Sequence, residues 1–314
     1  MRIRDKIKRP RRPVVVYEIL PPREKDGTLN SYAEIISSLL SQTHIDAINI
    51  PEVRDESMRG ARPVKNKTRA EPREFGKLLQ DIVGIEAIVN RVVVHQPVKE
   101  EMNWIEETYK IYEIENLIVV GGESSKINYI GPTVNSALRA INSRIDTNGC
   151  DILCGGITIP SRLKESKSLI NKSKNGSEFF TTQVLYDSSK IKRMMSHYQA
   201  RCNKMNTFPR RLLLSFAPVS SQKNIEFLKW LGVEIPDKTE SYLRGHPESM
   251  IERSLDVAVG VLNETLDHIK KNDLTVPIGL NVEHIMSYNF QASVEMLQEL
   301  ARIYREFCIK TDNY

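Results

Sequence analysis

Short apolar segments alternate with segments of helical periodicity along the whole chain, and no other feature constrains the fold as strongly. The apolar segments are hydrophobic on both faces, which is typical of strands covered on both sides by helices. Eight such strand–helix units in 314 residues predict a parallel sheet closed into a single-domain (β/α)8 TIM barrel. The predicted strands cover residues 14–20, 45–52, 86–94, 116–120, 150–158, 178–185, 211–216 and 276–282.

An open, doubly wound sheet is the alternative arrangement of the same units. Such sheets usually carry a glycine-rich turn directly after the first strand. Pro21 and Pro22 occupy that position here, so the sequence favours the closed barrel.

The chain divides into a basic N-terminal arm, residues 1–13, and the barrel, residues 14–314. Seven Lys and Arg residues lie in the arm, and the whole chain has a net charge of +5. Such an arm could contact nucleic acid or an acidic partner, or it could be a solvated tail that packs on the barrel. No aromatic residues alternate with its charges, so the second interpretation is favoured and nucleic acid is not expected as a partner.

The location of the protein is predicted from what its sequence lacks. It has no apolar run of about 18 residues, so no membrane span is expected. The arm has no apolar segment typical of a secretory signal, and we expect a cytoplasmic protein. The four cysteines are scattered and predict neither a disulfide framework nor a metal site. They are Cys150, Cys154, Cys202 and Cys308.

Glu18 is the only charged residue in the apolar run from Val14 to Leu20. Burying an ionised carboxylate costs several kcal/mol unless the group is paired or its pKa shifts. Glu18 is therefore either a structural carboxylate satisfied by a partner or an acid that carries a proton, and this segment alone leaves both interpretations open.

Polar residues gather at the predicted C-terminal ends of the strands, which face the active site in a barrel. They include no His and Cys cluster with metal-ligand spacing, no Lys placed for a Schiff base and no Gly-x-Ser-x-Gly elbow. The set suits a site that protonates a heterocycle and holds it by hydrogen bonds. Its members are Glu18, Asn49, Glu52, Arg91, His95, Gln96, Glu123, Ser124, Thr158, Gln183, Ser220, Gln222, Asn281, Glu283 and His284.

Four segments, in order, resemble the methylenetetrahydrofolate reductases. Residues 17–23, Tyr-Glu-Ile-Leu-Pro-Pro-Arg, are similar to the family's Phe-Glu-Phe-Phe-Pro-Pro-Lys/Arg opening. Residues 117–123, 179–187 and 214–220 are similar to its strands ending in Arg-Gly-Asp, Ile-Thr-Gln-x-x-Phe-Asp and Pro-Val-Ser. The resemblance covers the catalytic barrel.

The resemblance implies an oxidoreductase of one-carbon metabolism and methionine biosynthesis. It would reduce the methylene group on a tetrahydrofolate, or on a related or modified tetrahydropterin carrier, to a methyl group. FAD and NAD(P)H, or another electron donor such as a partner protein, would supply the hydride, and we also expect a homo-oligomer. Glu18 would be the general acid, and Glu123 would stand beside the flavin in place of the family's Asp.

The resemblance also assigns binding residues. The substrate contacts would be Gln183, Gln222, Asn281 and Glu283. The flavin contacts would be Arg91, Gly122, Glu123, Ile159, Glu165 and Lys172.

Several of these positions depart from the family pattern. Gly121 replaces the family's Arg, and Asn281-Val282-Glu283-His284 replaces its His-x-Tyr-Thr. Because such changes erode the flavin and substrate contacts, a non-catalytic or partner-dependent pterin-binding barrel that has lost flavin binding is the alternative function. Gly121 and Gly122 could bind a phosphate through their N–H groups or simply form a tight turn.

Overall fold

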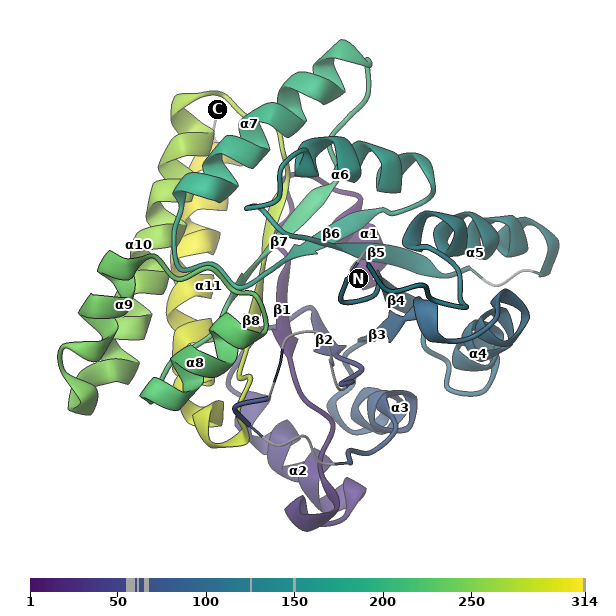
Figure 1. Cartoon of the computed structure of the whole chain (residues 1–314), viewed down its shortest axis with the longest axis horizontal. Helices are drawn as coiled ribbons and strands as arrows, with labels where there is room; N and C mark the ends of the chain where they lie inside the picture. The colour runs from purple at the N-terminus through teal and green to yellow at the C-terminus, as the bar shows by residue number, and fades with distance from the viewer. Residues whose placement is uncertain (55–59, 61, 65–67, 125, 149–150, 313–314) are drawn as a thin grey trace.

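The computed structural model describes residues 1–54, 60, 62–64, 68–124, 126–148 and 151–312. Within them, eight strands pair in chain order and β8 pairs with β1, so the sheet closes into a barrel with every pairing parallel (Figure 1). The predicted (β/α)8 barrel is confirmed. The strands are β1 Val15–Glu18, β2 Ala47–Ile50, β3 Ala87–Val92, β4 Asn116–Val120, β5 Leu153–Thr158, β6 Phe179–Thr182, β7 Arg211–Phe216 and β8 Ile278–Glu283. The first residue of the predicted strand 150–158, Cys150, lies outside the described residues.

Helices follow the strands and surround the barrel (Figure 1). Their ends obey ordinary capping rules: the Glu71 carboxylate accepts from the backbone N–H groups of Arg73 and Glu74 at the start of α3. Gly84 ends that helix in the left-handed conformation with φ 70°. The helices are α1 Ile3–Ile7, α2 Leu29–Leu40, α3 Pro72–Val83, α4 Val98–Lys110, α5 Val134–Asn148, α6 Glu165–Lys174, α7 Ser189–Lys204, α8 Gln222–Trp230, α9 Asp237–Arg244, α10 Met250–Lys271 and α11 Phe290–Asp312, with short 3-10 turns η1 Glu24–Asp26, η2 Val93–His95, η3 Pro247–Ser249 and η4 Ser287–Asn289.

Two helices have little signal in the sequence. The stretch before Gly245 contains α9, whose only buried residue is Leu243. A helix that buries one side chain shows little apolar periodicity. The other is α1, within the arm, which has only five residues.

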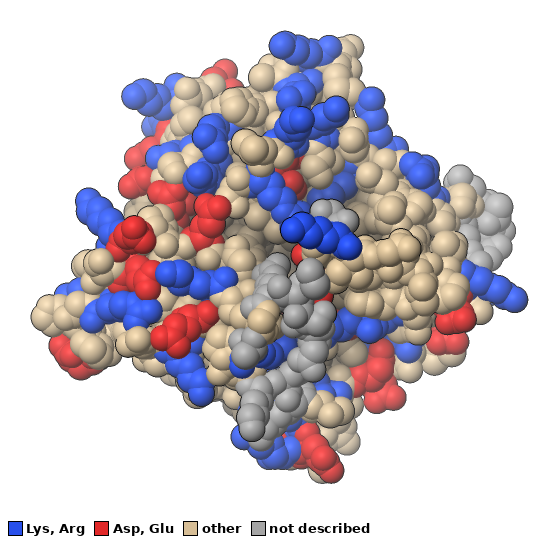
Figure 2. Space-filling view, in the orientation of Figure 1, with Lys and Arg blue, Asp and Glu red and all other residues tan. Residues whose placement is uncertain are grey.

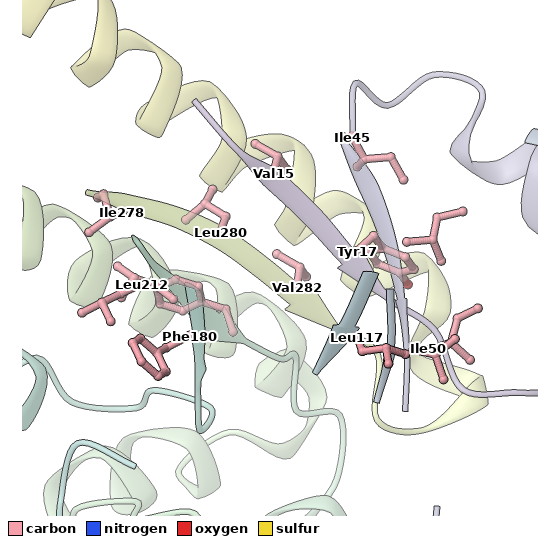
Figure 3. Packing of buried hydrophobic residues seen from close by; sticks show 14 of the residues in the cluster. Val15, Tyr17, Ile45, Ile50, Leu117, Phe180, Leu212, Ile278, Leu280 and Val282 are labelled. Carbon is pink, nitrogen blue, oxygen red and sulfur yellow. The ribbon is translucent and has the colours of Figure 1, made fainter. Parts of the chain in front are cut away.

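Outward side chains of the strands form the main core between the barrel and its helices. Tyr17, Ile50, Leu117 and Phe180 belong to this layer, and Figure 3 shows them with neighbouring apolar residues around the strands. Alternate residues of each strand point to opposite faces, so the residues between them face the barrel interior.

The inward side chains change from apolar to polar toward the C-terminal ends of the strands. The strand register places them in layers of four drawn from alternate strands. The floor is tight: a Cβ at Gly155 would lie 2.5 Å from the ring of Phe179. From the bottom upward, three layers are Val16, Ile88, Gly155 and Leu213; Asn49, Ile118, Thr181 and Asn281; and Glu18, Asn90, Ile157 and Ser215.

The basic arm packs on the N-terminal end of the barrel. Ile3 and Ile7 of α1 are 1% and 4% exposed and join the apolar interior cluster that contains Val16 and Phe179. In Figure 1 the N-terminus and α1 project onto the middle of the strand ring.

The arm's charges meet carboxylates that precede the strands. Its cations pair with the barrel as Arg2–Glu115, Arg4–Asp151, Lys6–Asp46 and Lys8–Glu178. At the start of β7, the buried guanidinium of Arg211 donates to the backbone carbonyl of Arg9 at 2.6 Å. Four of the arm's seven cations thus pair with carboxylates of the barrel.

The visible surface in Figure 2 carries many Lys and Arg side chains over α6 and α7, and mixed charges over α8 and α9. None of the helices in the described part of the chain is long and apolar enough to cross a membrane.

Candidate functional site

Two carboxyl groups lie side by side at the C-terminal mouth of the barrel. Glu18 ends β1 and Glu283 ends β8, and the strand register pairs these two residues. Both point inward, and both are half-buried. Neither carboxyl forms an ion pair with a Lys or Arg among the described residues.

Neutral amides hold the Glu18 carboxyl. The Asn49 side-chain nitrogen donates to its Oε2 at 2.6 Å, and the Asn281 nitrogen lies 3.4 Å from the same oxygen. Removal of the carboxyl from water outweighs these two hydrogen bonds and raises the pKa of Glu18 to about 7. A pKa near neutrality is the value that suits a group able to donate a proton at neutral pH.

The pKa of Glu283 lies well above its ordinary value. Burial is the main cause, and the negative charge of Glu18 is the second. The Asn281 side-chain nitrogen lies 3.1 Å from Oε1 of Glu283 and 3.0 Å from Oγ of Ser215. One amide thus faces Glu18, Glu283 and Ser215 together.

Three polar residues of the interior were not predicted from the sequence. Asn90, Thr181 and Ser215 are buried and face inward in the two layers that contain Glu18 and Asn281. Counting every second residue back from each strand end would have found them. Side-chain oxygens of Asn49, Asn90, Thr181 and Asn281 are buried without a hydrogen-bond partner, so this polar interior can accept hydrogen bonds from a ligand or from water.

Gln183 and Gln222, the other predicted substrate contacts, differ in exposure and in their partners. Gln183 follows β6 and donates its side-chain nitrogen to the Leu231 carbonyl at 3.2 Å. Gln222 is exposed and bonds Glu226 one turn along α8. Asn281 and Glu283 lie beside Glu18, whereas Gln222 forms a hydrogen bond with none of these three residues in the described part of the chain.

Glu123 and Gly122 follow β4 under an aromatic cover. The Glu123 backbone N–H donates to the Tyr129 hydroxyl at 3.0 Å. A Cβ at Gly122 would lie 2.2 Å from the Tyr129 ring, which explains why glycine is needed there. The ring of His95 packs against the edge of Tyr129 with centroids 5.4 Å apart.

Arg91, a predicted flavin contact, is satisfied by the protein. Its guanidinium bonds both oxygens of Glu101 at 2.7 and 2.9 Å, and it also reaches Gln96 and Glu52. It lies 4.3 Å from the ring centroid of Trp104. Arg91 follows Asn90 on β3 and faces outward, on the side of the strand opposite the polar interior.

The flavin contacts predicted after β5 also have internal partners. Lys172 donates to the Ile157 carbonyl at 2.6 Å and lies 3.6 Å from Glu165. Burial lowers the pKa of Lys172. Glu165 in turn accepts from the Thr158 hydroxyl at 3.1 Å, and its Oε1 lies 3.4 Å from the backbone nitrogen of Ile159.

His284 is a buried neutral histidine rather than a second acid. Its Nδ1 donates to the backbone carbonyl of Glu18 at 3.2 Å, and its ring stacks on Tyr17. Burial lowers the pKa of His284 to about 4, so the ring is uncharged at neutral pH. The described residues contain no group of three His, Cys, Asp or Glu side chains placed to hold a metal ion.

The fold and this mouth define a parallel (β/α)8 barrel with paired carboxyl groups set among neutral amides. The chain belongs to the methylenetetrahydrofolate reductase family: the family described as Methylenetetrahydrofolate reductase matches residues 2–301. No curated protein sequence matches the chain.

The first of three similar solved structures supports the fold. An uncharacterized protein from Clostridium thermocellum, described as binding two copies of 5-methyl-5,6,7,8-tetrahydrofolic acid, has a TM-score of 0.77 and 22% identity, over 96% of this chain and 99% of that one. A 2,3-dimethylmalate lyase has a TM-score of 0.45 and 12% identity, over 99% and 97%. The N-(5'-phosphoribosyl)anthranilate isomerase of Pyrococcus furiosus has a TM-score of 0.46 and 10% identity, over 93% and 99%.

Proposed function

We propose that the protein is an oxidoreductase that reduces the methylene group of a methylene-tetrahydrofolate, or of a related tetrahydropterin, to a methyl group. The single observation that carries the proposal is Glu18, a carboxyl group at the barrel mouth with neutral amides around it and a pKa raised to about 7. Family membership supports the reaction class. The folate bound by the Clostridium thermocellum protein supports the substrate class.

In this mechanism Glu18 donates its proton to the bridging nitrogen of the bound methylene pterin. The carbon–nitrogen bond to the methylene carbon breaks, its electrons stay on that nitrogen, and an iminium cation forms. A hydride from NADH, NADPH or another electron donor then adds to the cationic carbon and gives the methyl group. The inward oxygens of Asn49, Asn90 and Asn281 would accept hydrogen bonds from the pterin N–H groups.

FAD binding remains a prediction. When bound, a flavin would carry the hydride. Arg91 and Lys172, the cations predicted to hold it, are already bonded to Glu101 and to the Ile157 carbonyl. The residues present therefore do not offer the flavin these charges.

The internal partners of Arg91 and Lys172 favour a second candidate function, a pterin-binding barrel that does not reduce its ligand. Binding of methyl-tetrahydrofolate by calorimetry, without turnover in the presence of NADH, NADPH or reduced flavin, would support it. Formation of methyl product by the purified full chain with any of these donors would exclude it.

The acid assignment is tested with Glu18→Gln, which keeps the shape of the side chain and removes its proton. We expect turnover to fall at least about 100-fold, the usual contribution of a general acid. Pterin affinity should remain within a few fold. The matched control is Glu34→Gln on the exposed face of α2. Equal turnover in Glu18→Gln and Glu34→Gln would show that Glu18 is not the acid.

A further inference from the structure

Glu283 is a carboxyl group that the proposed mechanism does not use, beside the carboxyl group that it does use. The pairing of β1 with β8 sets Glu18 and Glu283 at the same register position, with both side chains on the inner face. Neighbouring parallel strands lie about 4.8 Å apart. Two ionised carboxylates held at this spacing repel each other strongly.

Few hydrogen-bond donors face the pair, and all of them are neutral. The Asn281 amide has two N–H hydrogens and faces oxygens of Glu18, Glu283 and Ser215, and the Ser215 hydroxyl in turn bonds Glu283. The Asn49 amide reaches only Glu18. A proton on one carboxyl relieves the shortage because a protonated carboxyl donates a hydrogen bond of its own.

The surrounding titratable groups add no positive charge at neutral pH. His284 on β8 is neutral because burial lowers its pKa to about 4. Tyr17 on β1 and Tyr186 after β6 are kept neutral because burial raises their pKa values. The elements β2 and β7 present Asn49 and Ser215, which do not titrate. Arg69 is directed to the Pro21 carbonyl at 2.7 Å.

We propose that Glu18 and Glu283 act as one acid that keeps a proton at neutral pH, with Glu283 as the positioning residue that sets the pH range in which Glu18 can donate. The role of Glu18 as donor rests on the proposed function, whereas the shared proton does not. When both carboxyls are protonated, Glu18 can give its proton to the substrate, and the pair keeps one proton, on Glu283 beside the new negative charge. The next proton from solvent restores the starting state. Such a pair titrates in two steps that belong to both residues.

The decisive experiment is an infrared titration of the full chain without substrate, with Glu283→Gln compared with the wild type. The wild type should show the absorbance of a protonated carboxylic acid at pH 8. Glu283→Gln should lose this absorbance at pH 8. The remaining Glu18 has no charged neighbour, so it should ionise at a pH about one unit or more below that at which the wild-type pair loses its last proton. Glu18→Gln should lower the midpoint of Glu283 in the same way, because coupling is reciprocal, and it serves if Glu283→Gln does not fold. Glu252→Gln, exposed on α10, is the control.

The reductase assay adds a second reading. Glu283→Gln should move the alkaline limb of the pH–rate profile downward by about one unit, and Glu283→Asp should restore most of it. A purely substrate-binding Glu283 would raise KM and leave the limb in place. An unchanged infrared midpoint in both Gln variants overturns the shared proton. A coupled infrared titration without methyl product would leave the pair intact and count against the reductase function alone.

Discussion

The Asn49 side-chain amide donates to Oε2 of Glu18 at 2.6 Å, the shortest of the hydrogen bonds that this carboxyl makes in the described structure. This bond connects the ends of β1 and β2, which the register places opposite each other. It favours the charged form of Glu18 and opposes the effect of burial on the pKa. Asn49 thus limits how firmly the acid holds its proton.

Replacing Asn49 by Leu should therefore raise the pKa of Glu18 above 7. A hydrogen bond to a charged group is worth about 1.5–3 kcal/mol, so a rise of about one to two pKa units is expected. The alkaline limb of the pH–rate profile should move upward by that amount. Asn263→Leu, exposed on α10, is the control. A limb that moves downward, or not at all, would contradict this account of the bond.

Glu18→Gln should stabilise the protein at neutral pH. Burial raises the pKa of Glu18 from 4.5 to about 7, so the native state binds more protons than the unfolded chain between these values. The free energy of unfolding then falls as pH rises through this window. At pH 8 the variant should gain about 1–3 kcal/mol over the wild type, since each unit of pKa shift is worth about 1.4 kcal/mol. Urea unfolding of the variant and the wild type at pH 8 and at pH 4.5 measures the gain in the free energy of unfolding. A gain that persists at pH 4.5 would show that the titration of Glu18 is not its cause.

The sequence predicted the barrel because strand–helix alternation is repeated eight times, and it predicted Glu18, Asn281 and Glu283 because polar residues at strand ends stand out. Asn90 and Thr181 were not predicted to belong to the site because they lie inside apolar strands, where only the two-residue period shows that they face inward. Because successive side chains of a strand point to opposite faces, Asn90 faces inward and the next residue, Arg91, faces outward.

The arm shows a different limit of sequence reasoning. Its charges suggested either a partner or a packed tail. Their partners, such as Asp46 and Glu115, precede strands that are far apart in sequence. Only closure of the barrel brings these carboxylates to one end of the molecule.

Glu101→Leu should destabilise the protein strongly. Glu101 is fully buried and bonds the guanidinium of Arg91 with both oxygens. Removing one member of a buried ion pair leaves a charge without its partner and costs about 3–5 kcal/mol. Glu100→Leu, at the exposed neighbouring position of α4, should change the free energy of unfolding by less than about 0.5 kcal/mol. Equal unfolding midpoints for the two variants would show that Arg91 does not depend on Glu101.

Ile3→Asp should open the N-terminal end of the barrel. Ile3 is 1% exposed within the cluster that contains Val16 and Phe179, and its backbone N–H donates to Glu86 at 2.9 Å. Losing a buried isoleucine costs about 2–5 kcal/mol, and a buried carboxylate adds to that cost. Arg11→Ala changes an exposed residue of the same arm and should be nearly neutral. If Ile3→Asp unfolds at a lower urea concentration than Arg11→Ala, α1 is part of the barrel core. Equal urea midpoints for the two variants would show that burial of Ile3 does not stabilise the barrel.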